Sequence, residues 1–574
     1  MVGTAKAGRA TRLWIMVGAV LLLGLTFRLL EISAPPFERH AFRQTQTLST
    51  IENFHAQGID LLHPKTLYMG DPGMFVLELP LFQALAALLY DVFGPHLEII
   101  RLLNILFGAA TLLVLFKFAD FFLDRITAIL AVLIYWLSPL NIAYQRSMLL
   151  DPMAVFCAWA VFYSLARLLF QSDFKPATGE SRADGLRFAV FAIGTVLIAM
   201  IKAIYLWPSL LLLVIVLIRR KFKPDTRLML ALVIYVVAGI CFLVWNHHAT
   251  RANNTSPFAR GITPVAHLGF SRMLTFDYFC QLAPRPKWWL GGFGTLLYPI
   301  GLWAAWAERR DRARVLPLWF VILTPPAYLI FFANINRPHD YYQLIIAPFL
   351  AIVPANGIRW LIARMAAAGK TRPVLNWRTL VFGALLIVAG WSGAWALWHD
   401  PAHPFKFAML LLAVPFYVLL FAAILTPTQH AALRSALLGG AGGCLLLASV
   451  LILLVCHQQS QPNTCVLKFQ RLCAGNVVTG KTAMIFVTPE VSGSSLHYML
   501  PDYIYASGLW GYGKCVVDAT DARPTFDELE PAFHKLEYVL FYGTQFPDWM
   551  PEGRFHLAVR DDTDRLYIFQ RNTD

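Results

Sequence analysis

Charged side chains are scarce in this chain. Only 14% of its 574 residues are Asp, Glu, Lys or Arg, whereas 57% are hydrophobic. A soluble domain typically has about 25% charged and about 45–50% apolar residues. The deficit of charge excludes a soluble enzyme, a disordered protein and a nucleic-acid-binding domain. It favours a polytopic membrane protein that is mostly α-helical.

Acidic residues are scarcer than basic ones. The sequence has 34 Asp and Glu against 48 Lys and Arg, a net charge of +14. Cytoplasmic loops of membrane proteins collect Lys and Arg, so most of this excess indicates topology and not an acidic partner. The C-x-x-C spacing of many metal sites is also absent, and the sequence predicts no metal site.

Thirteen apolar segments are expected to cross the membrane, for which about 20 residues are needed. They are 13–32, 97–118, 126–143, 152–170, 187–201, 204–218, 228–246, 289–306, 315–333, 342–360, 379–398, 406–425 and 435–456. Basic clusters lie at 6–12, 219–227, 309–314 and 364–378. With thirteen spans all four clusters are cytoplasmic, which places the N-terminus in the cytoplasm and the C-terminal tail outside it. We expect a multi-pass protein of a bacterial inner membrane.

Two ambiguous segments affect this count. Residues 74–93 are apolar but carry Glu78 and Pro80, and counting them as a span would separate the N-terminus from the 219–227 cluster. They are therefore interpreted as a re-entrant or interfacial helix of a long first outer loop, 33–96. One long span at 187–218 is the alternative to two short ones, but Lys202 in its middle argues against it.

The tail, 457–574, has a different pattern. Short apolar runs alternate with a helical stretch near 526–536, and the tail ends in a strand at 565–569. This predicts an extracytoplasmic α/β domain of about 110 residues after a transmembrane domain at 1–456. Cys465, Cys473 and Cys515 lie in the tail, where one disulfide is expected, although three cysteines do not define its pairing.

Polar groups crowd the start of an amphipathic helix in the first outer loop. Glu38 and His40 supply a carboxylate and an imidazole, and Arg39 and Arg43 supply two guanidinium groups; together they can act as a base and an anion clamp. Gln44 follows His40 by one helical turn and is expected on the same face. The alternative is a polar loop exposed to water.

Three ionisable residues stand in apolar surroundings, where charge is costly and often functional. Glu78 is one, with a cap at the interface as its alternative. Asp151 precedes a proline and fits a helix cap as well as a site. Lys202 suits a phosphate, unless it only extends to the interface. The loop 334–343 adds Arg337, His339 and Tyr342 on the same outer side, a mixture expected for a sugar phosphate.

Three motifs resemble a known family. His40 with F-R-Q-T-Q-T at 42–47, E-L-P-L-F-Q at 78–83 and H-D-Y-Y-Q at 339–343 match, in order and spacing, motifs of bacterial superfamily C glycosyltransferases. This branch groups with protein O-mannosyltransferases and lipid A aminoarabinose transferases. The resemblance covers most of residues 13–360. The segment Y-I-Y-A-S-G in the tail is a weaker match.

The resemblance implies a hexosyl- or pentosyltransferase that uses a polyprenyl-phosphate sugar, with or without a divalent metal. The acceptor would be a lipid, a glycan or a protein outside the cytoplasm, and the reaction an inverting single displacement. Glu38 stands where the family more often has Asp, and it would deprotonate or position the acceptor hydroxyl. The donor phosphate would be held by Arg43, Lys202 and Arg337. The sugar and acceptor site would be formed by His40, Gln44, Glu78, Asp151, His339 and Tyr342.

Two other functions compete with this one. A transporter or flippase of lipid-linked sugars would need the phosphate clamps but no base, and transporters commonly have repeated halves with sites at the midplane. Residues 13–220 and 228–456 show no such repeat, and the polar residues gather on one outer face, which favours the enzyme. A receptor or scaffold would leave Glu78 and Lys202 unexplained.

Overall fold

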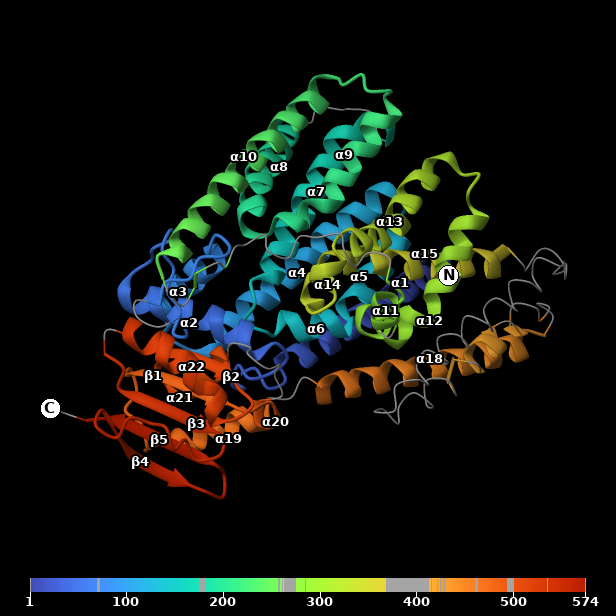
Figure 1. Cartoon of the computed structure of the whole chain (residues 1–574). Helices are drawn as coiled ribbons and strands as arrows, with labels where there is room; N and C mark the ends of the chain where they lie inside the picture. The colour runs from blue at the N-terminus through green and yellow to red at the C-terminus, as the bar shows by residue number, and fades with distance from the viewer. Residues whose placement is uncertain are drawn as a thin grey trace.

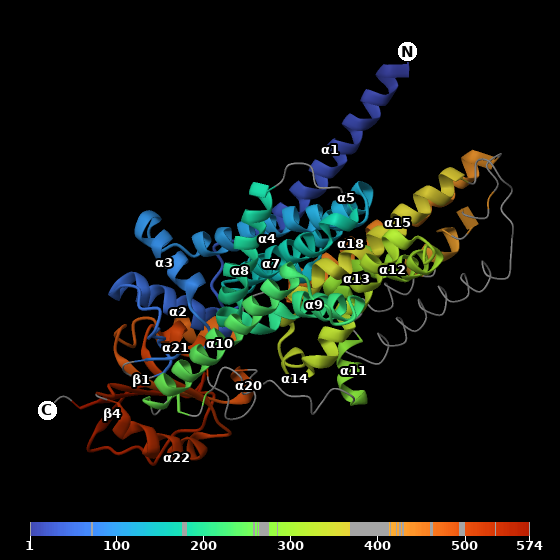
Figure 2. The same ribbon diagram turned by 90° about the horizontal axis from the view of Figure 1, so that it is seen from above.

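The computed structural model describes residues 2–69, 73–174, 181–256, 275–283, 285–367, 431–459, 463–492, 500–533 and 535–572. It also describes 259–260, 262 and short pieces of 412–430. A bundle of long helices carries an α/β unit at one end, built from the C-terminal residues (Figure 1). The N-terminal helix extends away from the bundle on another side (Figure 2).

The bundle is formed by helices of very different lengths. They are α1 (Val2–Leu29), α2 (Ala41–Gln57), α3 (Leu81–Phe93), α4 (Leu97–Phe122), α5 (Arg125–Trp136), α6 (Pro139–Gln145), α7 (Asp151–Phe174), α8 (Ser181–Lys202), η1 (Ala203–Leu206), α9 (Trp207–Arg219), α10 (Thr226–Asn254), α11 (Phe276–Leu282), α12 (Pro286–Ala307), α13 (Arg312–Phe331), α14 (Ala333–Asn336), η2 (Asp340–Ile346), α15 (Ala347–Ala367) and α18 (Ala431–Gln459).

Several of these helices are long enough to cross a membrane. Within the described residues, seven helical segments are long and apolar enough to cross a membrane, and α5 with α6, bent by 60°, would be an eighth. The prediction of a mostly helical, polytopic membrane protein is thus confirmed. Of the thirteen predicted segments, 379–398 lies outside the described residues and 406–425 is described only in part. The segment 289–306 forms α12, in which Gly291 adopts a non-helical conformation with φ 65°.

The helical run Asp184–Arg219 is 36 residues long, more than one crossing needs. It is interrupted at Lys202, whose φ of −159° and ψ of 72° are not helical. Arg220, the residue after α9, donates to the carbonyl of Leu169 near the end of α7. Arg227, at the start of α10, donates to the carbonyl of Leu168 and approaches the Asp184 carboxylate at 3.9 Å. Both ends of the run therefore lie together, so the chain reverses at Lys202 and α8 and α9 are antiparallel (Figure 1).

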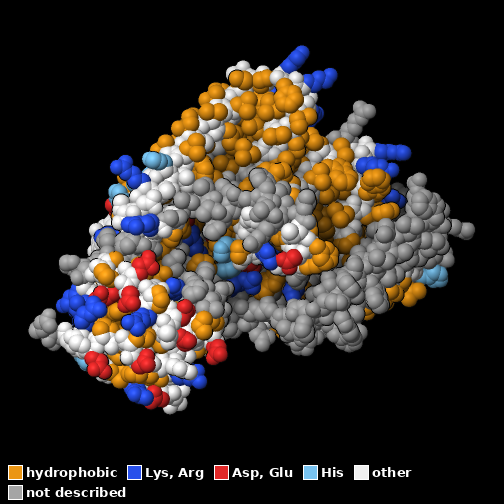
Figure 3. Space-filling view, viewed as in Figure 1, with side chains coloured by type: hydrophobic (Ala, Val, Ile, Leu, Met, Phe, Trp, Pro, Cys, Tyr) orange, Lys and Arg blue, Asp and Glu red, His pale blue; other side chains and the backbone are white. Residues whose placement is uncertain are grey.

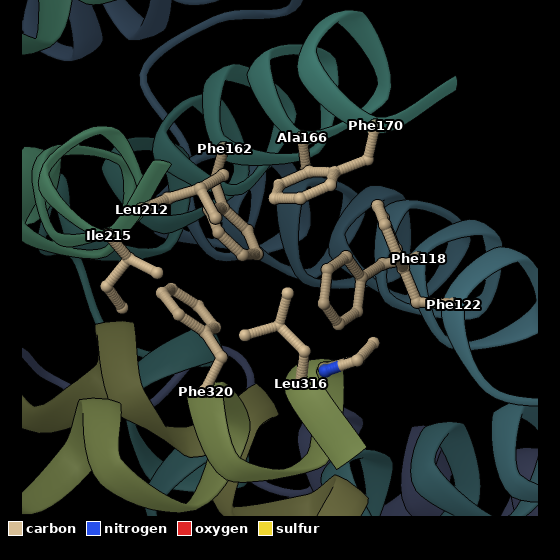
Figure 4. Close-up of a pocket in the computed structure, with 10 residues that line it drawn as sticks. Phe118, Phe122, Phe162, Ala166, Phe170, Leu212, Ile215, Leu316 and Phe320 are labelled. Atoms are coloured by element: carbon tan, nitrogen blue, oxygen red, sulfur yellow. The ribbon is translucent and has the colours of Figure 1, made fainter. Parts of the chain in front are cut away.

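Basic residues mark the end of the bundle opposite the C-terminal unit. In Figure 3, Lys and Arg side chains project from the tip where α9 passes into α10, above a broad hydrophobic surface. Near this end an apolar pocket joins α4, α7, α9 and α13 (Figure 4). It is lined by Phe118, Phe122, Phe162, Ala166, Phe170, Leu212, Ile215, Leu316, Pro317 and Phe320. The clusters 219–227 and 309–314, which adjoin α9 and α13, consequently lie at one end, as the predicted topology requires.

The apolar segment 74–93 does not span. Only its second part is helical, and α3 has 13 residues, too few for a crossing. It packs beside α2 in the first outer loop (Figure 2). Pro80 stands immediately before α3, and the preceding residues are extended, because a proline favours extended backbone before it. The prediction of a re-entrant or interfacial helix agrees with this geometry.

The C-terminal unit contains one five-stranded sheet. Its elements are α19 (Thr464–Cys473), β1 (Thr482–Val487), α20 (Pro489–Ser492), α21 (Pro501–Ser507), β2 (Trp510–Cys515), α22 (Ala519–Leu529), η4 (Glu530–Ala532), β3 (Tyr538–Tyr542), β4 (Phe555–Asp561) and β5 (Leu566–Arg571). The strand order is β2-β1-β3-β5-β4, with β1 parallel to β2 and β3 and the other pairs antiparallel. The sequences of β1 and β3 are almost continuously apolar because the residues of both strands are buried on both faces of the sheet.

Two expectations for the tail need correction. The predicted helix near 526–536 begins earlier, as α22, because Asp518 caps its first turn by accepting from Thr520 N and Asp521 N. The expected disulfide is not formed, because no disulfide joins Cys465, Cys473 and Cys515 in the described part of the chain. The thiol of Cys515 instead lies 3.4 Å from the Ser492 hydroxyl.

The C-terminal unit docks on the first outer loop. Asn463 N donates to Phe37 O at 2.6 Å, and Gly511 N donates to Leu67 O at 2.7 Å. The Tyr505 hydroxyl donates to Glu52 of α2 at 2.7 Å. The loop that carries the predicted site is thus held between the bundle and the sheet.

Candidate functional site

The first outer loop enters α2 through a strained residue. His40 precedes the helix with φ 55° and ψ 41°, a left-handed conformation that is uncommon outside glycine. Its ring therefore does not share a helical face with Gln44, contrary to the expectation from spacing. This conformation directs His40 toward η2, where its Nε2 lies 2.9 Å from Asp340 Oδ1. Backbone strain of this kind is often found at functional sites.

Asp340 is the centre of a buried polar cluster. It accepts hydrogen bonds from Arg39, His40 and the Tyr144 hydroxyl, so that both of its oxygens are used. Arg39 also lies over the Trp288 ring at 4.5 Å. Four segments distant in the sequence meet here. In Figure 3 basic and His side chains are visible in a hollow between the helices and the C-terminal unit.

An aromatic group continues from this cluster into the bundle. The His40 ring meets Tyr341 edge-on at 5.0 Å, and His339 stacks on Tyr341 at 5.2 Å. Tyr342 lies next to Tyr341, with 4.7 Å between the ring centroids. The three predicted residues His40, His339 and Tyr342 are therefore brought together.

Lys202 lies at the far side of this aromatic group. Its ammonium is 4.3 Å from the Tyr342 ring centroid and 4.9 Å from that of Tyr341, and it forms an ion pair with Asp151. The Lys202 and Asp151 side chains are only 8% and 1% exposed. Lys202 therefore does not extend to the solvent, contrary to the alternative. Asp151 Oδ1 also accepts from the Tyr205 hydroxyl at 2.6 Å, whereas its buried Oδ2 has no partner in the described part of the chain.

Arg43 and Glu78 form a second buried ion pair close to Lys202. Arg43 also donates to Gln46 at 2.6 Å, one turn along α2. Both residues line a small cavity with Gln46, Thr47, Thr50, Pro64, Phe75, Leu77, Pro80 and Gln83. Arg43 and Glu78 are near enough to influence Lys202 electrostatically, and Tyr341 and Tyr342 act on Arg43 in the same way. Two cations thus lie close to the same pair of tyrosines, Tyr341 and Tyr342.

Glu38 is buried between two arginines. Arg146 contacts its Oε1 at 2.9 Å, and Arg101 approaches the same oxygen at 3.5 Å. Within the described residues, Glu38 Oε2 accepts no hydrogen bond. Burial raises the pKa of Glu38, while the two arginines oppose that shift. One oxygen is therefore held, and the other remains available to a ligand.

Two predicted site residues are placed differently from the rest. Gln44 uses its amide to accept from Met148 N at 3.1 Å and to donate to Arg39 O at 3.0 Å, so it holds the loop in place. Arg337 turns away from the cluster and donates to Asp277 and Gln281 of α11. It is not brought together with Arg43 and Lys202.

Several residues of the site were not singled out from the sequence. Arg101 lies inside a predicted span, and a buried cation in a span is itself a signal of function. Tyr144, Arg146 and Tyr205 carry no such signal in the sequence. Arg285 donates to the carbonyls of Asn336 and Arg337 and is close enough to Asp340 to interact with it electrostatically.

The site does not fit a divalent metal in this conformation. No group of three or more His, Cys, Asp or Glu side chains in the described residues could hold a metal ion. Each site carboxylate is paired with a cation: Glu38 with Arg146, Glu78 with Arg43, Asp151 with Lys202 and Asp340 with Arg39. Such pairing neutralises the charge that a metal needs.

Comparisons with known proteins support the fold. Neither protein-family models nor curated proteins match this sequence. The structure is similar to that of ArnT from Cupriavidus metallidurans bound to undecaprenyl phosphate, with a TM-score of 0.58 and 14% identity over 97% of each chain. The apo structure of the same protein has a TM-score of 0.57 and 14% identity over 98% of each chain.

A second, more distant protein has a similar fold. The apo oligosaccharyltransferase of Archaeoglobus fulgidus has a TM-score of 0.53 and 10% identity, over 92% of this chain and 69% of that chain. At such identities the likeness concerns the fold. The fold agrees with the resemblance to superfamily C glycosyltransferases that the motifs carry.

Proposed function

We propose that this protein is an integral-membrane glycosyltransferase that takes a hexosyl or pentosyl group from a polyprenyl-phosphate donor. The observation that carries the proposal is the pair of buried cations, Arg43 and Lys202, next to Tyr341 and Tyr342. The fold adds support, because it is shared with ArnT bound to undecaprenyl phosphate.

Arg43 and Lys202 hold the donor phosphate in this proposal. The phosphate leaves with its negative charge when the bond between the anomeric carbon and the phosphate oxygen breaks. Cations placed at the leaving group stabilise that charge in the transition state. Glu78 and Asp151 keep the two cations in place before the donor binds. Arg337 belongs to the outer rim, where it orients the loop before η2.

Asp151 and the aromatic group receive the sugar. The buried Asp151 Oδ2 lacks a partner in the described residues, and a buried acceptor without a donor is costly. A sugar hydroxyl satisfies it. His40, His339 and Tyr342 belong to the aromatic group that contacts the sugar in this proposal. Gln44 and Glu78 act indirectly, through the residues that they hold.

Glu38 activates the acceptor. Its Oε2 receives the proton of the acceptor hydroxyl, whose oxygen attacks the anomeric carbon as the phosphate leaves. Arg101 and Arg146 fix the position of the carboxylate through Oε1, and burial raises its pKa toward that of a base. The acceptor is a lipid, a glycan or a protein, and the displacement inverts the anomeric centre.

We assign the orientation of the protein in the membrane from the charge at the two ends of the bundle. The 219–227 cluster lies at the end opposite the C-terminal unit, so we assign that end to the cytoplasm. Residues 1–456 then form the transmembrane domain, with a cytoplasmic N-terminus, and 457–574 the extracytoplasmic domain of a bacterial inner-membrane protein. The reaction takes place on the outer side, beneath this domain.

A panel of polyprenyl-phosphate sugars tests the proposal. The purified full-length protein is incubated with each donor and a membrane extract as acceptor, and released polyprenyl phosphate is measured by mass spectrometry. We expect release from one donor class, and at least tenfold less from an Arg43→Gln variant. Absence of release from every donor, with the protein folded, would contradict the proposal. A flippase would move the donor without releasing the phosphate.

A further inference from the structure

A second cationic cavity lies far from the proposed active site. It has a volume of about 490 Å³ and lies between α4, α7 and α8. The residues that line it are Lys117, Asp120, Phe121, Tyr163, Ser164, Arg167, Leu186, Arg187 and Val190. The mechanism proposed above uses none of them.

The cavity lies near the end of the bundle that carries the basic 219–227 cluster. Arg167 lies seven residues before the end of α7, and Arg187 lies six residues after the start of α8. The 219–227 cluster adjoins the same ends, because Arg227 contacts both Leu168 and Asp184. The cavity is therefore about two helical turns inside the cytoplasmic end of our topology, at the depth of lipid head groups.

Positive charge dominates the cavity. Among the described residues that line it, Lys117, Arg167 and Arg187 are cationic and Asp120 is acidic. Arg187 also pairs with Asp184 at 2.7 Å, outside the lining. Within the described residues, the cations of the lining therefore outnumber these two carboxylates.

Arg167 is held in place within this cavity. Its guanidinium lies 4.1 Å from the Phe121 ring centroid, and it donates to the Tyr163 hydroxyl at 3.1 Å. A guanidinium fixed in this way loses little freedom when it binds a phosphate.

Two exposed apolar stripes lead away from the cations. On α4, Leu106 and Leu113 are exposed on the face that ends at Lys117. On α8, Leu186 and Ile193 are exposed on the face that carries Val190. A ligand that fits both features has a negatively charged head and long apolar chains.

We propose that this cavity binds an anionic phospholipid of the cytoplasmic leaflet. Its phosphate contacts Lys117, Arg167 and Arg187, and its acyl chains lie along the stripes of α4 and α8. Basic pockets between transmembrane helices on the cytoplasmic side are suited to anionic head groups. The site is separate from the donor site, which lies at the other end of α7 and α8, where Asp151 and Lys202 meet.

Lipid binding to the purified full-length protein in detergent tests this proposal. Bound lipid is counted by native mass spectrometry during titration with phosphatidylglycerol, phosphatidylcholine or glycerol 1-phosphate. We expect phosphatidylglycerol to be retained at this site and phosphatidylcholine not to be. Lys117→Gln should weaken retention of phosphatidylglycerol about fivefold, the effect typical of one cation near a lipid head group, and Arg167→Gln at least as much.

Lys223→Gln is the matched control, because Lys223 is exposed at the same end but does not line the cavity. It should leave retention unchanged. Retention of phosphatidylcholine equal to that of phosphatidylglycerol would overturn the proposal. Retention of glycerol 1-phosphate as strong as that of the lipid would also overturn it. So would unchanged retention in Lys117→Gln. Lys117 is exposed, so this variant decides the matter even if Arg167→Gln does not fold.

Discussion

Replacing Lys202 with methionine separates two roles of the buried ammonium. In our account Lys202 neutralises Asp151 and also holds the donor phosphate. Methionine keeps most of the volume but removes the charge. It leaves the Asp151 carboxylate buried and unpaired, which costs about 3–5 kcal/mol of folding free energy. The single variant therefore loses stability and donor binding together, and it cannot distinguish the roles by itself.

The variant Asp151→Asn makes the distinction possible. The amide removes the unpaired charge, so Lys202→Met in this background should fold as well as Asp151→Asn does. A charge-assisted contact contributes about 1.5–3 kcal/mol, or about 10- to 150-fold in affinity. We expect Lys202→Met/Asp151→Asn to bind polyprenyl phosphate more weakly than Asp151→Asn by this factor. Polyprenyl phosphate lacks the sugar, so the proposed contact of Asp151 with the sugar does not affect the comparison.

Binding is measured by the thermal shift of the purified protein, with protein abundance recorded for each variant. Lys223→Met, at the opposite end of the bundle, is the control for loss of one positive charge. Equal affinities of Asp151→Asn and the double variant would mean that Lys202 does not hold the donor phosphate. Lys202 would then only neutralise Asp151.

Three other perturbations have defined outcomes. Glu38→Asp keeps the negative charge between Arg101 and Arg146 but moves the carboxylate away from the acceptor. We expect kcat to fall about 100-fold while donor affinity is retained. A normal kcat would show that Glu38 is not the base. Arg337→Gln should change donor affinity less than threefold, whereas Arg43→Gln should reduce it at least tenfold; titration with polyprenyl phosphate checks this, and a larger effect at Arg337 would contradict the assignment. Burial raises the pKa of Asp502 in α21 to about 6, above its ordinary value of 3.8. Between these values the folded state binds more protons than the unfolded state, so the sheet unit should lose about 3 kcal/mol of stability as pH rises through this window. Hydrogen exchange of β1 and β3 in the full chain measures this loss of stability, which Asp502→Asn should abolish. If the stability of that variant depended on pH as it does in the unchanged protein, Asp502 would not be the group responsible.

The sequence predicts the membrane fold because its signal is strong and local. Long apolar runs, interrupted by basic clusters, mark helices whatever their neighbours are. Lys202 shows the same principle at one position, since a charge inside an apolar run predicted the reversal that separates α8 from α9. The expected disulfide was wrong because the number of cysteines carries no information about their distances.

The site was predicted in part, because motifs name residues but not their partners. His40, His339 and Tyr342 were assigned to one sugar and acceptor site, and the structure brings their rings together. Asp340 accepts hydrogen bonds from Arg39, His40 and Tyr144, but the sequence indicated it only as one position of a motif. Its role depends on contacts between residues about 200 to 300 positions apart, which periodicity and composition do not encode.

Coupling of sugar transfer to phosphate release can be measured in a reconstituted system. The protein is reconstituted in liposomes with a polyprenyl-phosphate donor labelled in its sugar, together with an acceptor extract. Labelled acceptor and released polyprenyl phosphate are then quantified together over time. We expect equal amounts of both, and a large decrease of both in Glu38→Asp. Passage of the intact labelled donor across the bilayer, without released phosphate, would contradict this expectation and favour a transporter.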